Sequence, residues 1–380
     1  MITHKDVISR IKSAIIDKDV NERVAGIKAY TCLLNYYKPF EIATSRTERE
    51  YVLLIRLRVG DIEGFGEIAT SRMIDIEKLV KEIRDIDEKL RNKPITEAIE
   101  HVFYSLRDHA LKLAFTTAIL DAAARLLNVN FGELFSKVER KEILTDITIG
   151  IESLEETMRD LEKALENGFK AIKLKVGKGG IEKDFERIRA VAERLPEDTA
   201  LRIDANQGWT YKEALEIIPR IEKLNAKIEF IEQPLHRDLI DEINKLRTIT
   251  EIPIIVDESF RKSGDLNKVL GKVDGINLKI VKAGDPVDVF VAGKNAKEKE
   301  LLVMMGCAGE TNIGITVDAF LASIIPVDFA DLDSDLMKED ILKTRVTELK
   351  DSKRILPTGK GLSVTENNLL IEKLKLIYQS

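Results

Sequence analysis

The sequence predicts an α/β fold in which eight strands alternate with seven helices as a barrel, preceded by a smaller α+β domain. Two observations predict the barrel. From about residue 144 to 331, short β-prone runs alternate with amphipathic segments of helical period. A polar residue ends or interrupts successive runs, as expected where parallel strands finish at one face of a barrel. A third observation, a hairpin pattern followed by a helix-rich stretch, predicts the smaller domain.

Four segments follow one another along the chain. Residues 1–23 form a charged amphipathic helical extension, for which a packing or assembly role is expected. In residues 24–140, Tyr51–Val59 and the glycine-rich stretch after it predict an antiparallel hairpin, and apolar positions at helical spacing follow. Residues 141–340 form the barrel. Residues 341–380 are expected to return to the first domain.

The barrel strands are short and evenly spaced. The alternative is an open doubly wound sheet, but eight regular units without a Gly-x-Gly-x-x-Gly motif after the first strand favour a closed barrel. The strands are expected at Asp146–Ile151, Ala171–Val176, Ala200–Asp204, Ile228–Glu232, Ile252–Asp257, Gly275–Lys279, Leu301–Gly306 and Val327–Asp331.

The composition narrows the class of protein. The 380 residues carry 60 basic and 66 acidic side chains without long blocks of one sign, so we expect neither a nucleic-acid nor a membrane partner. No apolar run approaches the roughly 18–20 residues that span a bilayer. Cys32 and Cys307 show no metal-ligand spacing and are expected to be reduced, which fits the cytoplasm. The sequence leaves the oligomeric state open, and a homo-oligomer is compatible with it.

Two lysines lie on the second expected strand. Residues two apart in a strand face the same way, so Ile172, Leu174 and Val176 would face the outer helices. Lys173 and Lys175 would then point into the barrel, where an ammonium near other cations has a lowered pKa and can act as a base. The alternative is a solvated sheet edge, but a closed barrel has no edge.

Three carboxylates end the next three strands. Asp204, Glu232 and Asp257 are hard oxygen ligands from separate strands, which suit Mg²⁺. The alternative is three unrelated helix N-caps, since Asp is common at such junctions. Their equivalent positions on adjacent strands favour a metal site.

A third lysine, Lys279, ends the sixth strand. Strands two and six are opposite in a ring of eight, so Lys175 and Lys279 would lie on opposite faces of a carboxylate substrate bound between them. One lysine could remove the α-proton and the other could return a proton from the opposite side, while the metal stabilises the developing negative charge. Two opposed bases predict racemisation or epimerisation, whereas elimination needs only one.

These residues resemble the enolase superfamily, and specifically its muconate-lactonizing subgroup. The resemblance covers about residues 24–370 and implies a (β/α)7β TIM-like barrel with an N-terminal α+β capping domain. Lys175 and Lys279 would be the two bases, with Lys173 helping to hold the substrate carboxylate. Motifs similar to those of dipeptide epimerases are Asp-Ala-Asn-Gln-Gly-Trp (204–209), Ile-Glu-Gln-Pro (231–234), Asp-Glu-Ser (257–259), Ile-Asn-Leu-Lys (276–279) and Asp-Leu-Asp (331–333).

The last of these motifs implies the class of substrate. In dipeptide epimerases its two aspartates bind the free α-ammonium of the substrate, which would give Asp331 and Asp333 that role. The resemblance therefore implies Mg²⁺-dependent epimerisation of a dipeptide such as L-Ala-L-Glu at the α-carbon of its C-terminal residue. Other reactions of the subgroup (o-succinylbenzoate synthase, N-acylamino acid racemase, muconate cycloisomerase) and a non-catalytic ligand-binding barrel are the alternatives.

The sequence departs from the family pattern in two loops. Lys-x-Gly-Gly after strand six is here Lys-Ala-Gly-Asp (282–285), so the loop beside the second base is expected to differ. Gly-Cys-Ala-Gly-Glu (306–310) is a looser version of the family motif on strand seven, and Glu310 is the matching residue. In the capping loop 42–47, Arg46 could pair with a glutamate side chain of the substrate or be a surface charge.

Overall fold

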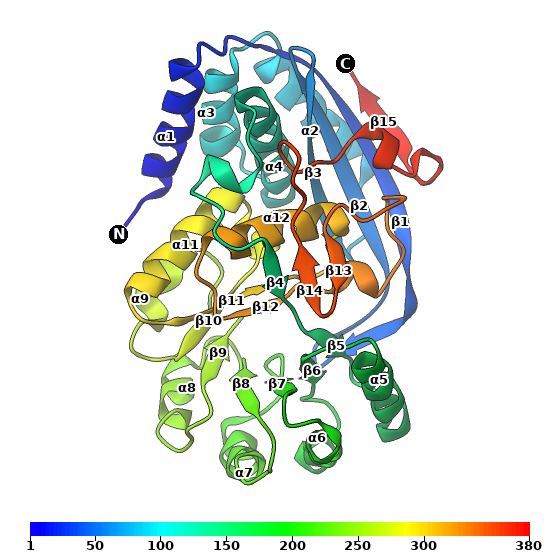
Figure 1. Cartoon of the computed structure of the whole chain (residues 1–380), viewed down its shortest axis with the longest axis vertical. Coiled ribbons are helices and arrows are strands. Elements are labelled where there is room, and N and C mark those ends of the chain that lie inside the picture. The colour runs from blue at the N-terminus through cyan, green and yellow to red at the C-terminus, as the bar shows by residue number, and fades with distance from the viewer.

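Eight parallel strands form the sheet on which the rest of the chain is arranged (Figure 1). In a computed structural model of residues 1–380, their spatial order β5 to β12 is also their order along the chain. The backbone N–H of Asp146 donates to Ala330 O at 3.3 Å and joins the two outer strands. This confirms the predicted barrel. The strands are β5 (Ile147–Ile149), β6 (Ala171–Lys175), β7 (Ala200–Asp204), β8 (Ile228–Glu232), β9 (Ile254–Val256), β10 (Gly275–Leu278), β11 (Leu302–Gly306) and β12 (Phe329–Asp331).

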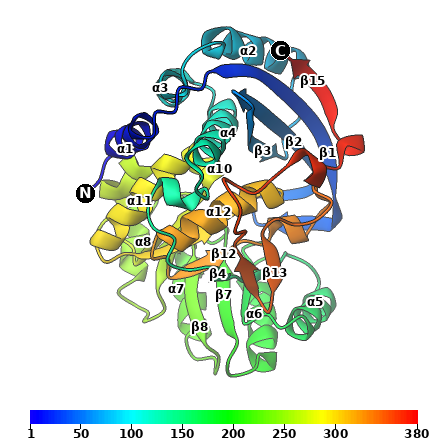
Figure 2. The same ribbon diagram turned by 45° about the horizontal axis from the view of Figure 1, so that its top comes forward.

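Helices connect successive barrel strands and cover the outside of the sheet. They are α5 (Leu154–Glu166), α6 (Ile181–Arg194), α7 (Tyr211–Ile221), α8 (Ile240–Leu246), α9 (Leu266–Val269), α10 (Ile280–Ala283), α11 (Pro286–Glu298) and α12 (Asn312–Ile324). All residues of α12 are buried, because this helix lies between the barrel and the domain above it (Figure 2). Helix α12 has apolar residues on every side, as expected of a helix that is buried all round.

An antiparallel sheet of order β15-β1-β2-β3 lies above the barrel with three helices. We call this sheet and its helices the cap. Adding a Cβ at Gly64 would place it 2.0 Å from Ala118 O, so glycine is needed where β3 crosses α4. The elements are β1 (Val24–Ile42), β2 (Ser45–Val59), β3 (Ile62–Thr70), α2 (Ile76–Leu90), α3 (Ile95–Ser105), α4 (His109–Leu127) and β15 (Lys375–Gln379).

The hairpin predicted from Tyr51–Val59 onward is β2–β3, and a second hairpin, β1–β2, precedes it. Strand β1 was not predicted, and its pairing with β2 continues to Ile42 opposite Ser45. The stretch expected to be a capping loop is therefore the tip of this hairpin, and Arg46 lies in β2. The pairing register of β1 shifts on both sides of its middle. These shifts interrupt the alternation of inward and outward side chains by which a strand is recognised in a sequence.

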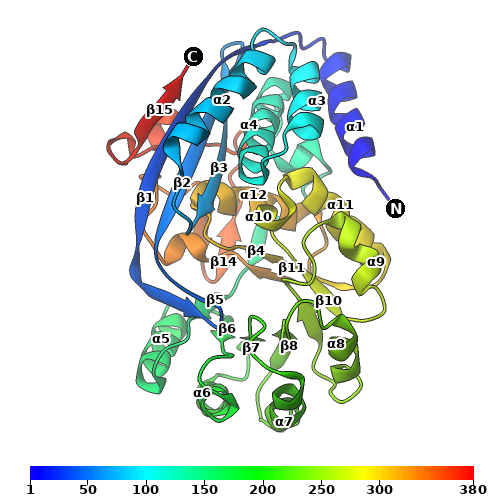
Figure 3. The same ribbon diagram turned by 180° about the vertical axis from the view of Figure 1, so that it is seen from behind.

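Smaller elements complete the chain. The N-terminal helix α1 (His4–Asp17) lies beside α3 and above α11 (Figure 3). None of the helices combines the length and apolar character needed to cross a membrane. The rest are β4 (Glu142–Leu144), β13 (Glu348–Lys350) and β14 (Lys353–Ile355), which form a three-stranded sheet, and 3-10 turns at Gly132–Leu134, Ser263–Asp265, Ser334–Leu336, Glu366–Asn368 and Ile371–Lys373.

A buried arginine stabilises the seam where the barrel closes. Arg202 of β7 donates from Nη1 to Asp146 Oδ2 and to Ala330 O, both at 2.7 Å, and thus contacts the chain on both sides of the seam. Its Nε donates to Glu229 Oε2 at 2.7 Å. Burial raises the pKa of Asp146 strongly, and the guanidinium of Arg202 opposes this shift by favouring the ionised carboxylate.

We expect Arg202→Met to destabilise the protein by about 3–5 kcal/mol, because it leaves the Asp146 carboxylate buried without a counter-charge. The measurement is urea unfolding in EDTA at neutral pH. Adding Asp146→Leu to this variant should recover most of the loss. Arg194→Met, which breaks an exposed ion pair with Glu162, should cost less than about 1 kcal/mol. Equal losses for the two single variants would contradict this account of the seam.

Candidate active site

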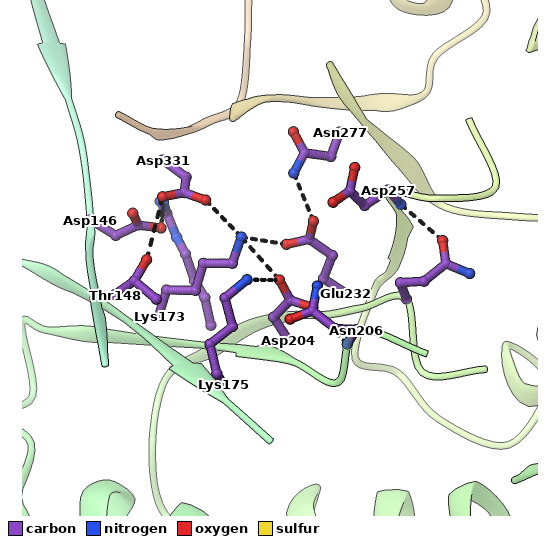
Figure 4. A network of polar contacts seen from close by, with 12 residues as sticks. Asp146, Thr148, Lys173, Lys175, Asp204, Asn206, Glu232, Asp257, Asn277 and Asp331 are labelled. Carbon is purple, nitrogen blue, oxygen red and sulfur yellow. Dashed lines mark hydrogen bonds and ion pairs between the residues drawn. The ribbon is translucent and has the colours of Figure 1, made fainter. Parts of the chain in front are cut away.

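The two lysines of β6 point into the barrel, as the alternation predicts (Figure 4). Both side chains are buried. Lys173 Nζ lies 2.7 Å from Glu232 Oε2, 2.7 Å from Asp331 Oδ2 and 3.3 Å from Asp204 Oδ2. Lys175 Nζ lies 2.6 Å from the same oxygen of Asp204. One strand therefore supplies two ammonium groups to carboxylates from three other strands. The lowered pKa expected from the sequence is wrong for Lys173: burial opposes its charge, but Asp331, Glu232 and Asp204 outweigh burial and raise its pKa.

The three carboxylates come from neighbouring strands. Asp204 ends β7 and is in register with Glu232, which ends β8, and Asp257 directly follows β9. Burial opposes ionisation of Asp204, but the ammonium groups of Lys175 and Lys173 outweigh it and lower its pKa. The pKa of Glu232 is raised by burial and by the charge of Asp204. These shifts indicate strong electrostatic coupling within one buried cluster.

A second pair of lysines lies on the other side of this cluster. Lys279 follows β10, and its Nζ lies 2.9 Å from Asp257 Oδ2. Lys282 contacts the other oxygen of Asp257 and donates to the carbonyls of Asp257, Phe260 and Asn277 at 2.9, 3.0 and 2.8 Å. Burial opposes the charge on Asp257, but Lys279 and Lys282 outweigh it and lower its pKa. Sequence reasoning missed this contact of Lys282, which lies in the short helix α10 directly after Lys279.

Lys175 ends the second strand of the eight-stranded sheet, and Lys279 directly follows the sixth. The carboxylates of the third, fourth and fifth strands lie between them in the strand order. A planar group held at these carboxylates would have one lysine on each face, which is the arrangement that proton transfer between opposite faces requires.

The oxygen groups of this cluster fit a hard dication such as Mg²⁺. Asp204, Glu232 and Asp257 are the residues that could ligate it. Two further buried oxygens at the same strand ends, Asn206 Oδ1 and Glu258 Oε2, have no hydrogen-bond partner. Burial and the charge of Asp257 raise the pKa of Glu258 to about 7, so this group would gain from a nearby cation. Asn206 lies in the Asp-Ala-Asn motif, but sequence reasoning gave it no role.

The aspartates of the Asp-Leu-Asp motif lie together at the end of β12. Asp331 accepts from Lys173, and its Oδ1 is 3.5 Å from Thr148 Oγ1. Asp333 accepts from the backbone N–H of Thr148 at 2.7 Å, and Cys307 Sγ lies 3.6 Å from its Oδ1. Burial and the charge of Asp331 raise the pKa of Asp333 to about 7. Asp331 is already paired with Lys173, whose charge outweighs burial and lowers the pKa of Asp331, so only Asp333 lacks a counter-charge.

The remaining two predicted site residues differ in placement. Glu310 is buried, and its Oε2 accepts from the backbone N–H groups of Ala308 and Gly309 at 2.6 and 2.8 Å, which holds the loop after β11. Arg46 is exposed on the hairpin tip, 3.3 Å from Glu48 Oε1 and 3.9 Å from Glu41 Oε2. Its ion pairs are therefore with the hairpin itself and not with the buried cluster.

Comparison with known proteins identifies the family. Residues 156–368 match the model of the enolase C-terminal domain-like family. The L-Ala-D/L-Glu epimerase of Thermotoga maritima is 31% identical over 338 residues, which are 84% of this chain and 95% of that protein. The chain belongs to the enolase superfamily. This confirms the resemblance that the sequence motifs indicated.

Solved structures of other superfamily members have the same overall fold. A substrate-liganded L-Ala-D/L-Glu epimerase from Bacillus subtilis superposes with a TM-score of 0.82 at 28% identity, over 90% of this chain and 98% of that one. A dipeptide epimerase from Cytophaga hutchinsonii, complexed with Mg and D-Ala-L-Val, gives a TM-score of 0.83 at 25% identity, over 93% and 99% of the two chains.

The raised pKa of Asp333 predicts a pH-dependent cost in stability. Because the folded protein binds this proton more tightly than the unfolded chain, the contribution of Asp333 favours folding below about pH 4 and is lost as the pH rises through about 7. We expect Asp333→Asn, which keeps an oxygen for Thr148, to be more stable than the wild type at about pH 8 by on the order of 1–3 kcal/mol. The gain should shrink toward about pH 4.5.

Urea unfolding of the protein in EDTA at both pH values measures this difference. Asp198→Asn, which replaces an exposed carboxylate paired with Lys170, is the matched control and should give no gain at the higher pH. A loss of stability for Asp333→Asn at the higher pH would contradict the conclusion that the ionised Asp333 carboxylate is unfavourable in its buried position.

Proposed function

We propose that this chain is a Mg²⁺-dependent dipeptide epimerase that inverts the α-carbon of the C-terminal residue of a dipeptide such as L-Ala-L-Glu. The observation that carries this proposal is the placement of Lys175 and Lys279 on opposite strands of the barrel, with three buried carboxylates on the strands between them. We also propose a cytoplasmic location, because both cysteines are free thiols.

The lysines perform the proton transfer. The Nζ of Lys175, held by Asp204, and the Nζ of Lys279, held by Asp257, would approach the substrate from its two faces. Burial opposes the charged form of Lys279, but the carboxylate of Asp257 outweighs it and raises its pKa, so Lys279 holds a proton ready for delivery. Lys175 would remove the α-proton of one epimer, and the roles would exchange for the other epimer. Lys173, between Glu232 and Asp331, would hold the substrate carboxylate.

Mg²⁺ held by Asp204, Glu232 and Asp257 would supply positive charge beside the substrate carboxylate and thereby lower the free energy of the state in which the α-proton has left. The structural support for this ligand set is the buried, unpartnered oxygens of Asn206 and Glu258.

The free amine of the dipeptide has a matching anchor. Asp331 ends the last strand and Asp333 lies two residues beyond it, both buried, and the raised pKa of Asp333 signals that a cation there would be favourable. An α-ammonium would supply this charge, which supports a dipeptide over an acyl-blocked substrate. Arg46 is the residue we propose for a glutamate side chain, because the hairpin tip reaches the barrel through a hydrogen bond at 2.8 Å from Ile151 N to Glu41 O.

Proton NMR of a dipeptide panel with Mg²⁺ in D₂O tests the proposal. The wild type should exchange the α-proton of the C-terminal residue and form the second diastereomer. Lys279→Ala should lower epimerisation by at least about 100-fold, because one face then has no proton carrier, while exchange from the Lys175 face continues. Lys170→Ala, which removes an exposed lysine just before β6, should be unchanged.

Three outcomes would contradict the proposal. Absence of exchange with every dipeptide would exclude the substrate class. Unchanged turnover of Lys279→Ala would remove this lysine from the reaction. Little loss on dipeptides in both Asp331→Asn and Asp333→Asn would favour a substrate without a free amine, as in the other reactions of the subgroup.

A further inference from the structure

The segment from Lys279 to Asp285 connects β10 to α11 and contains the proposed second base. It consists of Lys279, the single turn of α10, Gly284 in a left-handed conformation with φ of +81°, and Asp285 as the N-cap of α11. We call it the second-base segment. Its inner side is held by Lys282, which bonds to Asp257 and three backbone carbonyls.

The outer end of this segment is held by a buried charge cluster. The side chain of Asp285 is only 2% exposed, and its Oδ1 accepts from the backbone N–H of Asp288 at 2.8 Å. The same Oδ1 lies 3.1 Å from Nε2 of His4, the first residue of α1. Its Oδ2 lies 2.8 Å from Nζ of Lys112 in α4 of the cap. Burial opposes the charge on Asp285, but His4 and Lys112 outweigh it and lower its pKa.

The cap also contacts the middle of the segment. His109 Nε2 lies 2.9 Å from Val281 O, and a Cβ at Gly284 would lie 2.5 Å from His109 Cε1. The imidazole therefore packs directly against the backbone of the turn. Since His109 and Lys112 are three apart on α4, one face of this helix contacts the second-base segment at two points.

Helix α1 is itself fixed to the barrel next to this cluster. The side-chain amide of Asn295 in α11 accepts from Ile2 N and donates to Ile2 O, both at 2.9 Å. Figure 3 shows α1 beside α3 and above α11, so it bridges the cap and the barrel helix that follows the second base. His4 packs against Phe103 of α3 with ring centroids 5.4 Å apart.

We propose that helix α1, through the contact of His4 with Asp285, positions the second base Lys279, so that His4 and Asp285 are positioning residues for proton delivery on that face. The inference rests on the function proposed above. Asp285 lies six residues after Lys279 at the outer end of a segment with one helical turn, so loss of the His4 contact would loosen one of the points that hold this turn. A displacement of about 1 Å can lower the rate of a positioned reaction by up to roughly 100-fold.

Comparing inversion with exchange in D₂O tests this role. For the epimer whose α-proton faces Lys175, removal and return by Lys175 gives exchange without inversion, whereas inversion also requires Lys279. We expect His4→Ala to lower the ratio of inversion to exchange by roughly three- to tenfold relative to the wild type. Asp285→Asn, which retains an N-cap side chain, should lower it in the same direction.

Two further variants separate positioning from general loss of stability. His4→Gln, whose amide can still donate to Asp285, should restore the wild-type ratio. Lys12→Ala removes the ion pair of α1 with Glu100 but leaves Asp285 untouched, and its ratio should be unchanged. A proportional fall of exchange and inversion in both His4→Ala and Asp285→Asn would show a merely structural role and overturn the inference.

The controls also separate this inference from the proposed function. A wild type that epimerises dipeptides, together with an unchanged ratio in His4→Ala and Asp285→Asn, would overturn only the positioning role. A wild type that exchanges no dipeptide proton would overturn the proposed function first.

Discussion

Charge balance in the buried mouth of the barrel constrains the position of every residue in the site. Asp204, Glu232 and Asp257 are removed from water, and an uncompensated carboxylate in such surroundings costs several kcal/mol. Each is therefore within ion-pair distance of an ammonium group from another part of the barrel: Lys173 and Lys175 on one side, Lys279 and Lys282 on the other. The same groups that satisfy this requirement are those able to carry protons.

A buried carboxylate also joins the cap to the barrel. Glu67 of β3 is buried, and its Oε1 accepts from the backbone N–H groups of Thr311 and Gly314 at 2.8 and 3.0 Å, at the start of α12. A carboxylate at this end of a helix is favoured by the helix dipole. The contact fixes the loop after β11, which contains Glu310, to the cap. Together with α1 and α4 around Asp285, it makes the cap part of the support for the site and not only a cover.

Much of the barrel and of its charged residues could be predicted from the sequence. Alternation in β6 was enough to place Lys173 and Lys175, because period-2 patterns report directly on the two faces of a strand. Asp204, Glu232, Asp257 and Lys279 were recognisable because they end successive strands. Eight parallel strands with short connections leave few other arrangements.

The contacts that the sequence did not reveal are those between distant segments. Strand β1 was missed because its register shifts interrupt the alternation. The contact between His4 and Asp285 joins residues 281 positions apart, and no local pattern reports on such a pair. The ion pairs of Arg46 with Glu41 and Glu48 depend on the hairpin register, which only the structure defines.

In the proposed reaction, the α-carbon beside the substrate carboxylate lies between two lysines on its opposite faces. A crystal structure of the protein with Mg²⁺ and L-Ala-L-Glu tests this directly. We expect the α-carbon of the C-terminal residue to lie between Nζ of Lys175 and Nζ of Lys279, with the free amine at Asp331 and Asp333. A dipeptide bound with both lysines on the same face of that carbon, or with its amine far from the aspartate pair, would contradict it.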